Sequence, residues 1–232
     1  MHLLIPAAGM GRRMGRERNK LLLTLLGKPL LAWTLIAAEA SQRIHWIGIV
    51  GQPEDWPDWQ ALIKALAVTK PVAFIPGGTT RQESVYNGLQ TLPPEAEQVL
   101  IHDGARCLAT ADLIDRCADA MNEHSGLIAA IPVKDTIKVV DEKGWIQATP
   151  DRSQLWAAQT PQGFEVQKLK DCHEAGRQQG WEVTDDAALF EKFNLPVHIV
   201  AGEETNLKLT TPADLAIAEL ILRQRLDQLQ SK

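Results

Sequence analysis

The sequence is short of cysteine. Only three of the 232 residues are cysteines, namely Cys107, Cys117 and Cys172. An odd number of cysteines without metal-ligand spacing disfavours both a disulfide framework and a zinc site. We therefore expect reduced thiols and a cytoplasmic protein.

Long apolar runs and a net positive charge are also missing. No apolar run reaches the ~18 residues of a transmembrane helix, and the chain opens on a predicted strand rather than on a signal segment. The net charge is −5, and aromatic residues make up only 5% of the chain. This charge disfavours a general binder of nucleic acid or anionic membranes. We expect a soluble protein with neither nucleic acid nor membrane as a partner.

The sequence has no internal repeat, low-complexity tract or Pro/Ser-rich linker. Nothing in the composition marks a domain boundary, and a length of 232 residues suits one large domain. We therefore treat residues 1–232 as a single domain.

The chain does contain a regular alternation of two patterns. Short apolar runs bounded by turn residues predict strands at 2–6, 44–50, 71–75, 99–102, 127–133 and 196–200. Helical periodicity predicts helices at 29–40, 58–67, 81–92, 111–122, 166–178 and about 212–228. The alternation indicates an α/β fold, with a Rossmann-like, mostly parallel twisted sheet and helices on both faces. Ligands of such sheets bind beyond the carboxyl ends of the strands.

One segment departs from this alternation. Residues 136–141 and 145–149 have the pattern of two short strands joined by a turn that ends at Gly144. They predict a protruding β-hairpin arm at about 135–152. An isolated two-stranded hairpin is only marginally stable in water, so the arm needs something to pack on. A second subunit is one candidate, and the body of the same subunit is the other.

A loop of small and basic residues follows the first predicted strand. Residues 6–15 run Pro-Ala-Ala-Gly-Met-Gly-Arg-Arg-Met-Gly, and Lys20 lies a few residues beyond. Alanine and glycine let the backbone turn tightly and point N–H groups at anionic oxygens. The pattern lacks the Gly-Lys-Ser/Thr of a P-loop and the third glycine of the dinucleotide fingerprint. It predicts a polyphosphate cradle for nucleotidyl transfer, although Gly-x-Gly alone also fits a plain strand-to-helix turn.

Two further motifs follow predicted strands. Residues 77–85, Gly-Gly-Thr-Thr-Arg-Gln-Glu-Ser-Val, offer open backbone at a helix start, and they equally fit a simple helix cap. Residues 99–106 bring Asp103 and Arg106 to the end of a buried strand. These two side chains could form a structural ion pair. Alternatively, Asp103 could orient a substrate hydroxyl or hold Mg²⁺ through water.

The order of the motifs resembles one enzyme family. Ala-Ala-Gly-x-Gly-Arg-Arg-Met is followed by Gly-Gly-x-x-Arg-x-x-Ser-Val, His-Asp-x-Ala-Arg, Pro-Val-x-Asp-Thr-x-Lys, Asp-Arg, Thr-Pro-Gln and Asn-x-Lys-x-Thr. This succession, from residue 2 to about 222, resembles the 2-C-methyl-D-erythritol 4-phosphate cytidylyltransferase family of nucleotidyltransferases. The resemblance implies a fold of the nucleotide-diphospho-sugar transferase type. It also implies an enzyme of non-mevalonate isoprenoid synthesis that joins CTP to 2-C-methyl-D-erythritol 4-phosphate.

The resemblance implies roles for individual residues. Arg13 and Lys20 would be catalytic and would stabilise the transition state on the triphosphate. The nucleotide-binding residues would be Ala7, Ala8, Gly9, Gly11, Gly78, Arg81, Ser84 and Gly104. The substrate-binding residues would be Asp103, Arg106, Thr136, Arg152, Thr184 and Lys208, of which Thr136 and Arg152 would come from the arm of a partner subunit.

The resemblance further implies a homodimer, and Mg²⁺ held mainly through the CTP phosphates, with no protein ligand assigned to the metal. Two positions depart from the family pattern. Thr79 stands where some relatives have an acidic residue, and Asn19 stands in place of a proline before Lys20. The first leaves a base contact unassigned, and we expect the second to change only the stiffness of the loop.

Two other functions fit the same motifs. A cytidylyltransferase for another alditol phosphate, such as ribitol 5-phosphate, would have much the same loops. A nucleotide-binding module that has lost turnover would keep the cradle as well. We expect His102 and the other five histidines to be structural.

Overall fold

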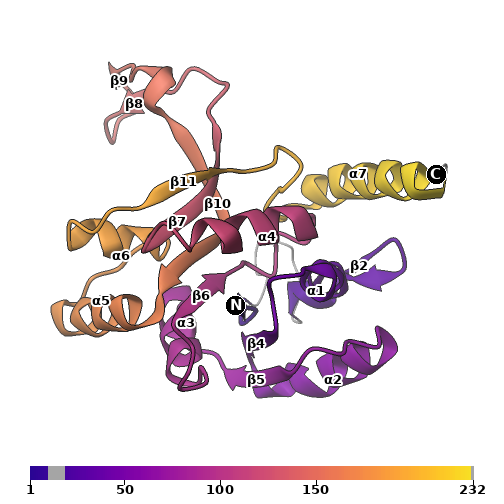
Figure 1. Ribbon diagram of the computed structural model, residues 1–232. Coiled ribbons are helices and arrows are strands. Elements are labelled where there is room, and N and C mark those ends of the chain that lie inside the picture. The colour runs from indigo at the N-terminus through magenta and orange to yellow at the C-terminus, as the bar shows by residue number, and fades with distance from the viewer. Residues whose placement is uncertain (10–18, 231–232) are drawn as a thin grey trace.

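A computed structural model describes residues 1–9 and 19–230 of the chain (Figure 1). Its centre is a seven-stranded sheet with the strand order β11-β7-β10-β6-β1-β4-β5. The strands are β1 (His2–Pro6), β4 (Trp46–Gly51), β5 (Val72–Pro76), β6 (Gln98–Ile101), β7 (Gly126–Pro132), β10 (Trp156–Glu165) and β11 (His198–Ala201).

The sheet is mostly parallel, as the sequence predicts. Strand β1 runs parallel to both β4 and β6, β4 runs parallel to β5, and β7 runs parallel to β11. Strand β10 is antiparallel to β6 and β7 and lies between them. The sequence did not predict β10. Polar residues and Pro161 interrupt the apolar pattern by which a strand is predicted. The pairing of β10 with β7 also shifts register between Ala158 and Gln162.

Helices cover both faces of the sheet. The described helices are α1 (Leu30–Ala40), α2 (Trp56–Ala65), α3 (Arg81–Gln90), α4 (Ala111–Ala120), α5 (Val166–Gln179), α6 (Ala187–Lys192) and α7 (Pro212–Gln230), of which α7 extends beyond the sheet (Figure 1). All but α6 were predicted, and α6 is too short for helical periodicity to stand out. None of the helices in the described part of the chain is long and apolar enough to cross a membrane.

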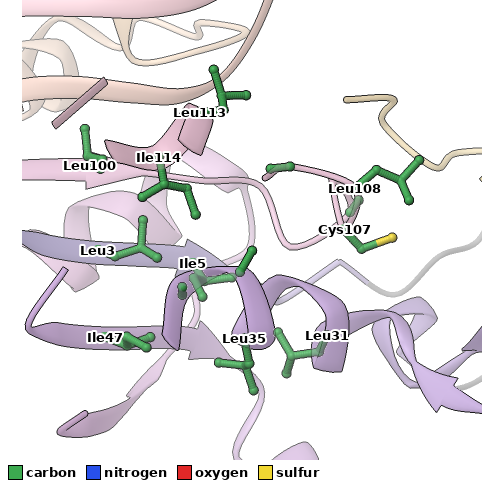
Figure 2. Close-up of a cluster of buried hydrophobic side chains, with 14 of the residues drawn as sticks. Leu3, Ile5, Leu31, Leu35, Ile47, Leu100, Cys107, Leu108, Leu113 and Ile114 are labelled. Carbon is green, nitrogen blue, oxygen red and sulfur yellow. The ribbon is translucent and has the colours of Figure 1, made fainter. Parts of the chain in front are cut away.

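The core has two halves, one on each side of the sheet. Successive side chains of a strand point to opposite faces, so Leu3 and Ile5 of β1 pack in one half and Leu4 packs in the other. Figure 2 shows the first half, where Leu3 and Ile5 lie near Leu35 of α1 and Ile114 of α4. Helices α2 and α7 also contribute to this half, whereas α3, α5 and α6 cover the other.

The predicted hairpin arm forms and stands away from the sheet, at the top of Figure 1. Its strands are β8 (Val139–Val140) and β9 (Ile146–Ala148), which pair antiparallel. Apolar side chains of the arm face solvent: Val140 is 54% exposed, Trp145 is 71% exposed and Ile146 is 62% exposed. Large apolar side chains gathered at such exposure mark a surface for contact with another molecule.

Candidate active site

A cavity of about 280 Å³ lies at the carboxyl ends of β1 and β6. It is lined by Pro6, Ala7, Ala8, Gly9, Lys20, Leu21, Gly78, Thr79, Thr80, Arg81, Ser84, Asp103, Gly104, Ala105 and Lys208. Every predicted nucleotide-binding residue that the structure describes is among them. Gly11 and Arg13, which were also predicted here, lie outside the described residues. We refer to this space as the first cavity.

Two glycines allow the segments around the first cavity to approach each other. A Cβ on Gly77 would lie 2.7 Å from the Cβ of Ala8, and a Cβ on Gly104 would lie 2.7 Å from Cδ1 of Leu21. Both distances are too short for real atoms. Glycine is therefore needed at 77, where the loop after β1 meets the segment before α3, whereas a Cβ at 104 would have to displace the end of the Leu21 side chain.

The segment 77–85 both caps a helix and lines the first cavity. Thr80 is the N-cap of α3, where its side chain accepts a hydrogen bond from the backbone N–H of Glu83 at 3.0 Å. The backbone N–H and the hydroxyl of Thr79 both donate to Oε2 of Glu83, each at 2.7 Å. A carboxylate thus reaches position 79 although the residue there is threonine.

A second cavity of about 190 Å³ adjoins the first. The two share Arg81, Asp103 and Lys208 in their walls. The rest of the second cavity is lined by Arg106, Ala158, Gln159, Thr160, Gln162, Thr184 and Asp185. Strand β10 supplies four of these residues, so the strand that the sequence did not predict forms one wall.

Asp103 joins the two cavities electrostatically. Its Oδ1 accepts from Nε of Arg81 at 2.9 Å, and its Oδ2 lies 2.7 Å from Nζ of Lys208. Burial alone would raise the pKa of this carboxyl group, but the two cations outweigh burial and hold the pKa well below its usual range. Asp103 is therefore ionised at any pH at which the protein would work.

Asp186, to which the sequence assigned no role, is a second partner of Arg81. Nη1 of Arg81 donates to Oδ2 of Asp186 at 2.8 Å, and Nε2 of His173 lies 3.1 Å from Oδ1 of the same carboxylate. Burial would lower the pKa of Arg81, yet Asp186 and Asp103 more than compensate and raise it. The Arg81 guanidinium is thus clamped between two carboxylates at the junction of the cavities.

Of the two alternatives for Asp103 and Arg106, the ion pair between them does not form. Among the described residues, Asp103 forms ion pairs with Arg81 and Lys208. Arg106 donates instead to two backbone carbonyls, that of Asn206 at 2.7 Å and that of Ala158 at 3.1 Å. These bonds tie the turn after β6 to β10 and to the loop that carries Lys208.

The contacts of His102 support the structural role that the sequence predicts. Complete burial lowers the pKa of His102 to about 4, so the ring is neutral near pH 7. Its Nε2 faces the carbonyl oxygen of Arg106 at 3.1 Å and its Nδ1 faces Oγ1 of Thr160 at 3.0 Å. The same Oγ1 accepts from the backbone N–H of Asp103 at 3.0 Å. The ring therefore holds the loop around Asp103 against β10.

The remaining predicted residues fall into two groups. Lys20 lies in the 3-10 helix η2 (Lys20–Leu22), where its Nζ donates to the carbonyl oxygen of Leu209 at 3.2 Å, and it faces the first cavity. Thr136 and Arg152 lie on the exposed arm and line neither cavity of their own chain. The structure therefore brings together the body residues and leaves these two apart from them.

The site offers few protein ligands to a metal ion. Within residues 1–9 and 19–230, no three histidine, cysteine or acidic side chains gather in a way that could hold one. Asp103 is the acid that lines both cavities, and two cations already pair with it.

The fold and the site define a class of protein. A mostly parallel sheet, a loop of small residues at the end of its first strand, and two adjoining cavities lined by lysine and arginine are the features of a nucleotidyltransferase. The family model of 2-C-methyl-D-erythritol 4-phosphate cytidylyltransferase matches residues 1–224. The chain belongs to this family.

Individual relatives agree with the family match. The chain is 76% identical over 228 residues to 2-C-methyl-D-erythritol 4-phosphate cytidylyltransferase of Acaryochloris marina, covering 98% of this chain and 96% of that protein. Among solved structures, 4-diphosphocytidyl-2C-methyl-D-erythritol synthase from Anaerococcus prevotii is 30% identical with a TM-score of 0.86, covering 96% of this chain and 97% of that one. The cytidylyltransferase from Thermus thermophilus is also 30% identical, with a TM-score of 0.77 and coverage of 96% and 98%.

Proposed function

We propose that this protein transfers the cytidylyl group of CTP to 2-C-methyl-D-erythritol 4-phosphate and releases pyrophosphate, a step of isoprenoid synthesis. The observation that carries the proposal is the pair of adjoining cavities that share Arg81, Asp103 and Lys208. Such a reaction needs two anionic reactants held side by side, with cations between and around them. Membership of the family gives the identity of the two reactants.

The proposed chemistry needs alignment and positive charge rather than a general base. A phosphate oxygen of the alditol phosphate attacks the α-phosphorus of CTP, and the bond from that phosphorus to the bridging oxygen of pyrophosphate breaks. The phosphate monoester is already a nucleophile, so no proton has to be removed from it. Negative charge that develops on the leaving pyrophosphate is stabilised by cations. This fits a site in which the buried His102 is neutral and engaged on both ring nitrogens.

Each cavity would hold one reactant. CTP would bind in the first cavity, with its phosphates on the loop after β1 and beside Lys20 and Arg13. Gly78 and Ser84 would face its cytosine end. The alditol phosphate would bind in the second cavity, where Lys208 and Arg106 supply positive charge and Thr184 and Asp103 supply polar contacts to its hydroxyl groups.

Mg²⁺ would enter with the nucleotide. Since the described residues contain no cluster of three ligands for a metal, we assign no protein ligand to it and expect the CTP phosphates to hold it. A bound Mg²⁺ neutralises part of the phosphate charge. The residues of the chain would then align the triphosphate, with Lys20 and Arg13 acting on its phosphates and Arg81 shaping the junction between the cavities.

A homodimer completes the proposal. The exposed apolar side chains of the arm, including Trp145 and Ile146, support a surface that a second copy of the chain covers. In the dimer, Thr136 and Arg152 of one arm would complete the site of the neighbouring subunit. The buried, unpaired state of the three cysteines supports the cytoplasm as its location.

A pyrophosphate-release assay tests the function. It crosses CTP, UTP, ATP and GTP with 2-C-methyl-D-erythritol 4-phosphate and with ribitol 5-phosphate. We expect turnover with CTP and the methylerythritol phosphate well above every other combination. Higher turnover with ribitol 5-phosphate would assign a different alditol phosphate, and CTP binding without pyrophosphate release would indicate a silent binding module.

A further inference from the structure

Asn19 has an amide group whose hydrogen-bonding capacity is almost fully used. The residue is only 5% exposed. Its Oδ1 accepts from the backbone N–H of Leu21 at 3.0 Å and so caps η2. Its Nδ2 donates to the carbonyl oxygen of Ala7 at 2.7 Å and to Oδ2 of Asp55 at 2.7 Å. The expectation that Asn19 changes only loop stiffness is therefore wrong.

The three partners fix the orientation of this amide. The carbonyl of Ala7 and the carboxylate of Asp55 accept hydrogen bonds, whereas the backbone N–H of Leu21 donates one. A flipped amide would place its oxygen against two acceptors and its nitrogen against a donor. Only one of the two orientations satisfies all three partners.

The amide connects three segments that are far apart in the sequence. Ala7 follows β1, Leu21 belongs to η2, and Asp55 ends the 3-10 helix η3 (Pro53–Asp55) after β4. Asn19 and Asp55 line neither of the two cavities, whereas Ala7 and Lys20 both line the first. The contacts of Asn19 therefore set the spacing between Ala7, in the loop after β1, and Lys20.

This spacing matters for the proposed chemistry. Misplacing a catalytic group by about 1 Å can cost ~10²-fold in rate, because the stabilising charge no longer lies where charge develops. Asn19 fixes the position of the Lys20 backbone, from which a long and flexible side chain extends. The Nζ of Lys20 donates to the carbonyl oxygen of Leu209 at 3.2 Å. A change at Asn19 would move the base of the lysine without removing its charge.

We propose that Asn19 and Asp55 are positioning residues for nucleotidyl transfer. Asp55 orients the Asn19 amide, and the amide holds Lys20 at a set distance from Ala7 in the loop after β1. The inference rests on the role of Lys20 in the proposed function, and it adds two residues to which no motif assigned a role.

Four variants separate the contributions to this arrangement. Asn19→Ala removes all three bonds and is expected to lower kcat about tenfold to a hundredfold, with the KM for CTP changed much less. Asn19→Asp sets a second carboxylate against Asp55 and should lower kcat further. Asp55→Ala should lower kcat severalfold, and Asp55→Asn, which keeps an acceptor oxygen, should recover most of that loss. The exposed neighbour Glu54 on the same turn supplies the matched control, Glu54→Ala, with unchanged kinetics.

A double-mutant cycle with Lys20→Ala distinguishes positioning from general destabilisation. If Asn19 acts through Lys20, then adding Asn19→Ala to Lys20→Ala should change kcat by less than about twofold. A full additional loss in that background would overturn the inference. The melting temperature of each variant is measured alongside, and Asp55→Ala carries the same cycle if Asn19→Ala does not fold.

A readout without turnover separates this inference from the proposed function. The rate at which an acylating reagent modifies Lys20 is followed by peptide mass spectrometry, with the exposed Lys28 of the same chain as the internal reference. Asn19→Ala is expected to change the Lys20 rate severalfold and to leave the Lys28 rate unchanged. An unchanged Lys20 rate would overturn the inference, whereas absence of pyrophosphate release by the parental protein would overturn the function alone.

Discussion

The first cavity and the hairpin arm differ in what completes them. The cavity is built within one chain, from buried residues such as Asp103 whose polar groups have partners. The arm has little beneath it and exposes Trp145 and Ile146. The difference teaches that contacts within one chain suffice to arrange the cavity, whereas the same chain leaves the large apolar side chains of the arm exposed.

The largest expected effect lies in the cavity. Lys20→Ala should lower kcat by about 10² to 10³, because one charge that stabilises the leaving pyrophosphate is lost. The same range is expected for Arg13→Ala. Pyrophosphate release measures both, and Lys28→Ala, which removes an exposed lysine, is the control. A near-parental rate for Lys20→Ala would remove Lys20 from the catalytic machinery.

The next prediction joins the two regions. Arg152→Ala should lower activity strongly if the arm completes the site of a neighbouring subunit. Coexpression of Lys20→Ala chains with Arg152→Ala chains should then restore activity, since one site of each mixed dimer keeps both residues. Pyrophosphate release by the purified heterodimer is the measurement. A heterodimer that stays inactive would show that the arm does not serve the neighbouring site.

A smaller effect concerns the electrostatics of the cavity. Asp103→Asn should lower the free energy of unfolding by about 2 kcal/mol at pH 7, because Arg81 and Lys208 lose a buried, charged partner. The loss is no larger because solvent screens part of the attraction between these charges. The folded pKa of Asp103 is depressed, so its stabilisation is present above the unfolded pKa of ~3.9 and is lost as the pH falls toward the folded value.

Urea denaturation at several pH values checks this. The difference between the parental protein and Asp103→Asn should be constant from pH 7 to about pH 5 and should shrink below that. A difference independent of pH down to the acid limit would mean that the pairing of Asp103 contributes little.

The smallest effect is expected at the arm. Trp145→Ser should weaken the dimer about tenfold, as expected for loss of a large aromatic contact worth ~1.4 kcal/mol. The free energy of unfolding of the monomer should change by less than about 0.5 kcal/mol, because the side chain is 71% exposed. Sedimentation at a series of protein concentrations measures the association. An unchanged dimer would place the interface elsewhere on the molecule.

The parts of the fold with strong local patterns were predicted from the sequence. The alternation of Leu3, Leu4 and Ile5 across the sheet requires only the period of a strand, and the cap of α3 at Thr80 requires only its neighbour at 83. The hairpin arm was predicted from a turn with Gly144 between two short strands. The backbone φ of Gly144 is +85° in the structure. Each of these features depends on residues close in sequence.

Strand β10 and the partners of Asp103 could not be predicted from the sequence. β10 contains Pro161 and several polar residues, and it becomes a strand because β6 and β7 pair with it on both sides. Arg106 is three residues from Asp103 and was one candidate partner, yet the carboxylate pairs with Arg81 and Lys208. The role of Asn19 depends on its contact with Asp55, which is distant in the sequence.

The sequence by itself determined the class of fold and the family to which the motifs belong. Local periodicity and small residues at strand ends carry that information, because they act within a few residues of chain. Tertiary structure alone decided the second cavity, the clamp on Arg81 and the orientation of the Asn19 amide. These depend on hydrogen bonds and ion pairs between distant segments, and only the packed sheet determines which of the possible partners come within reach.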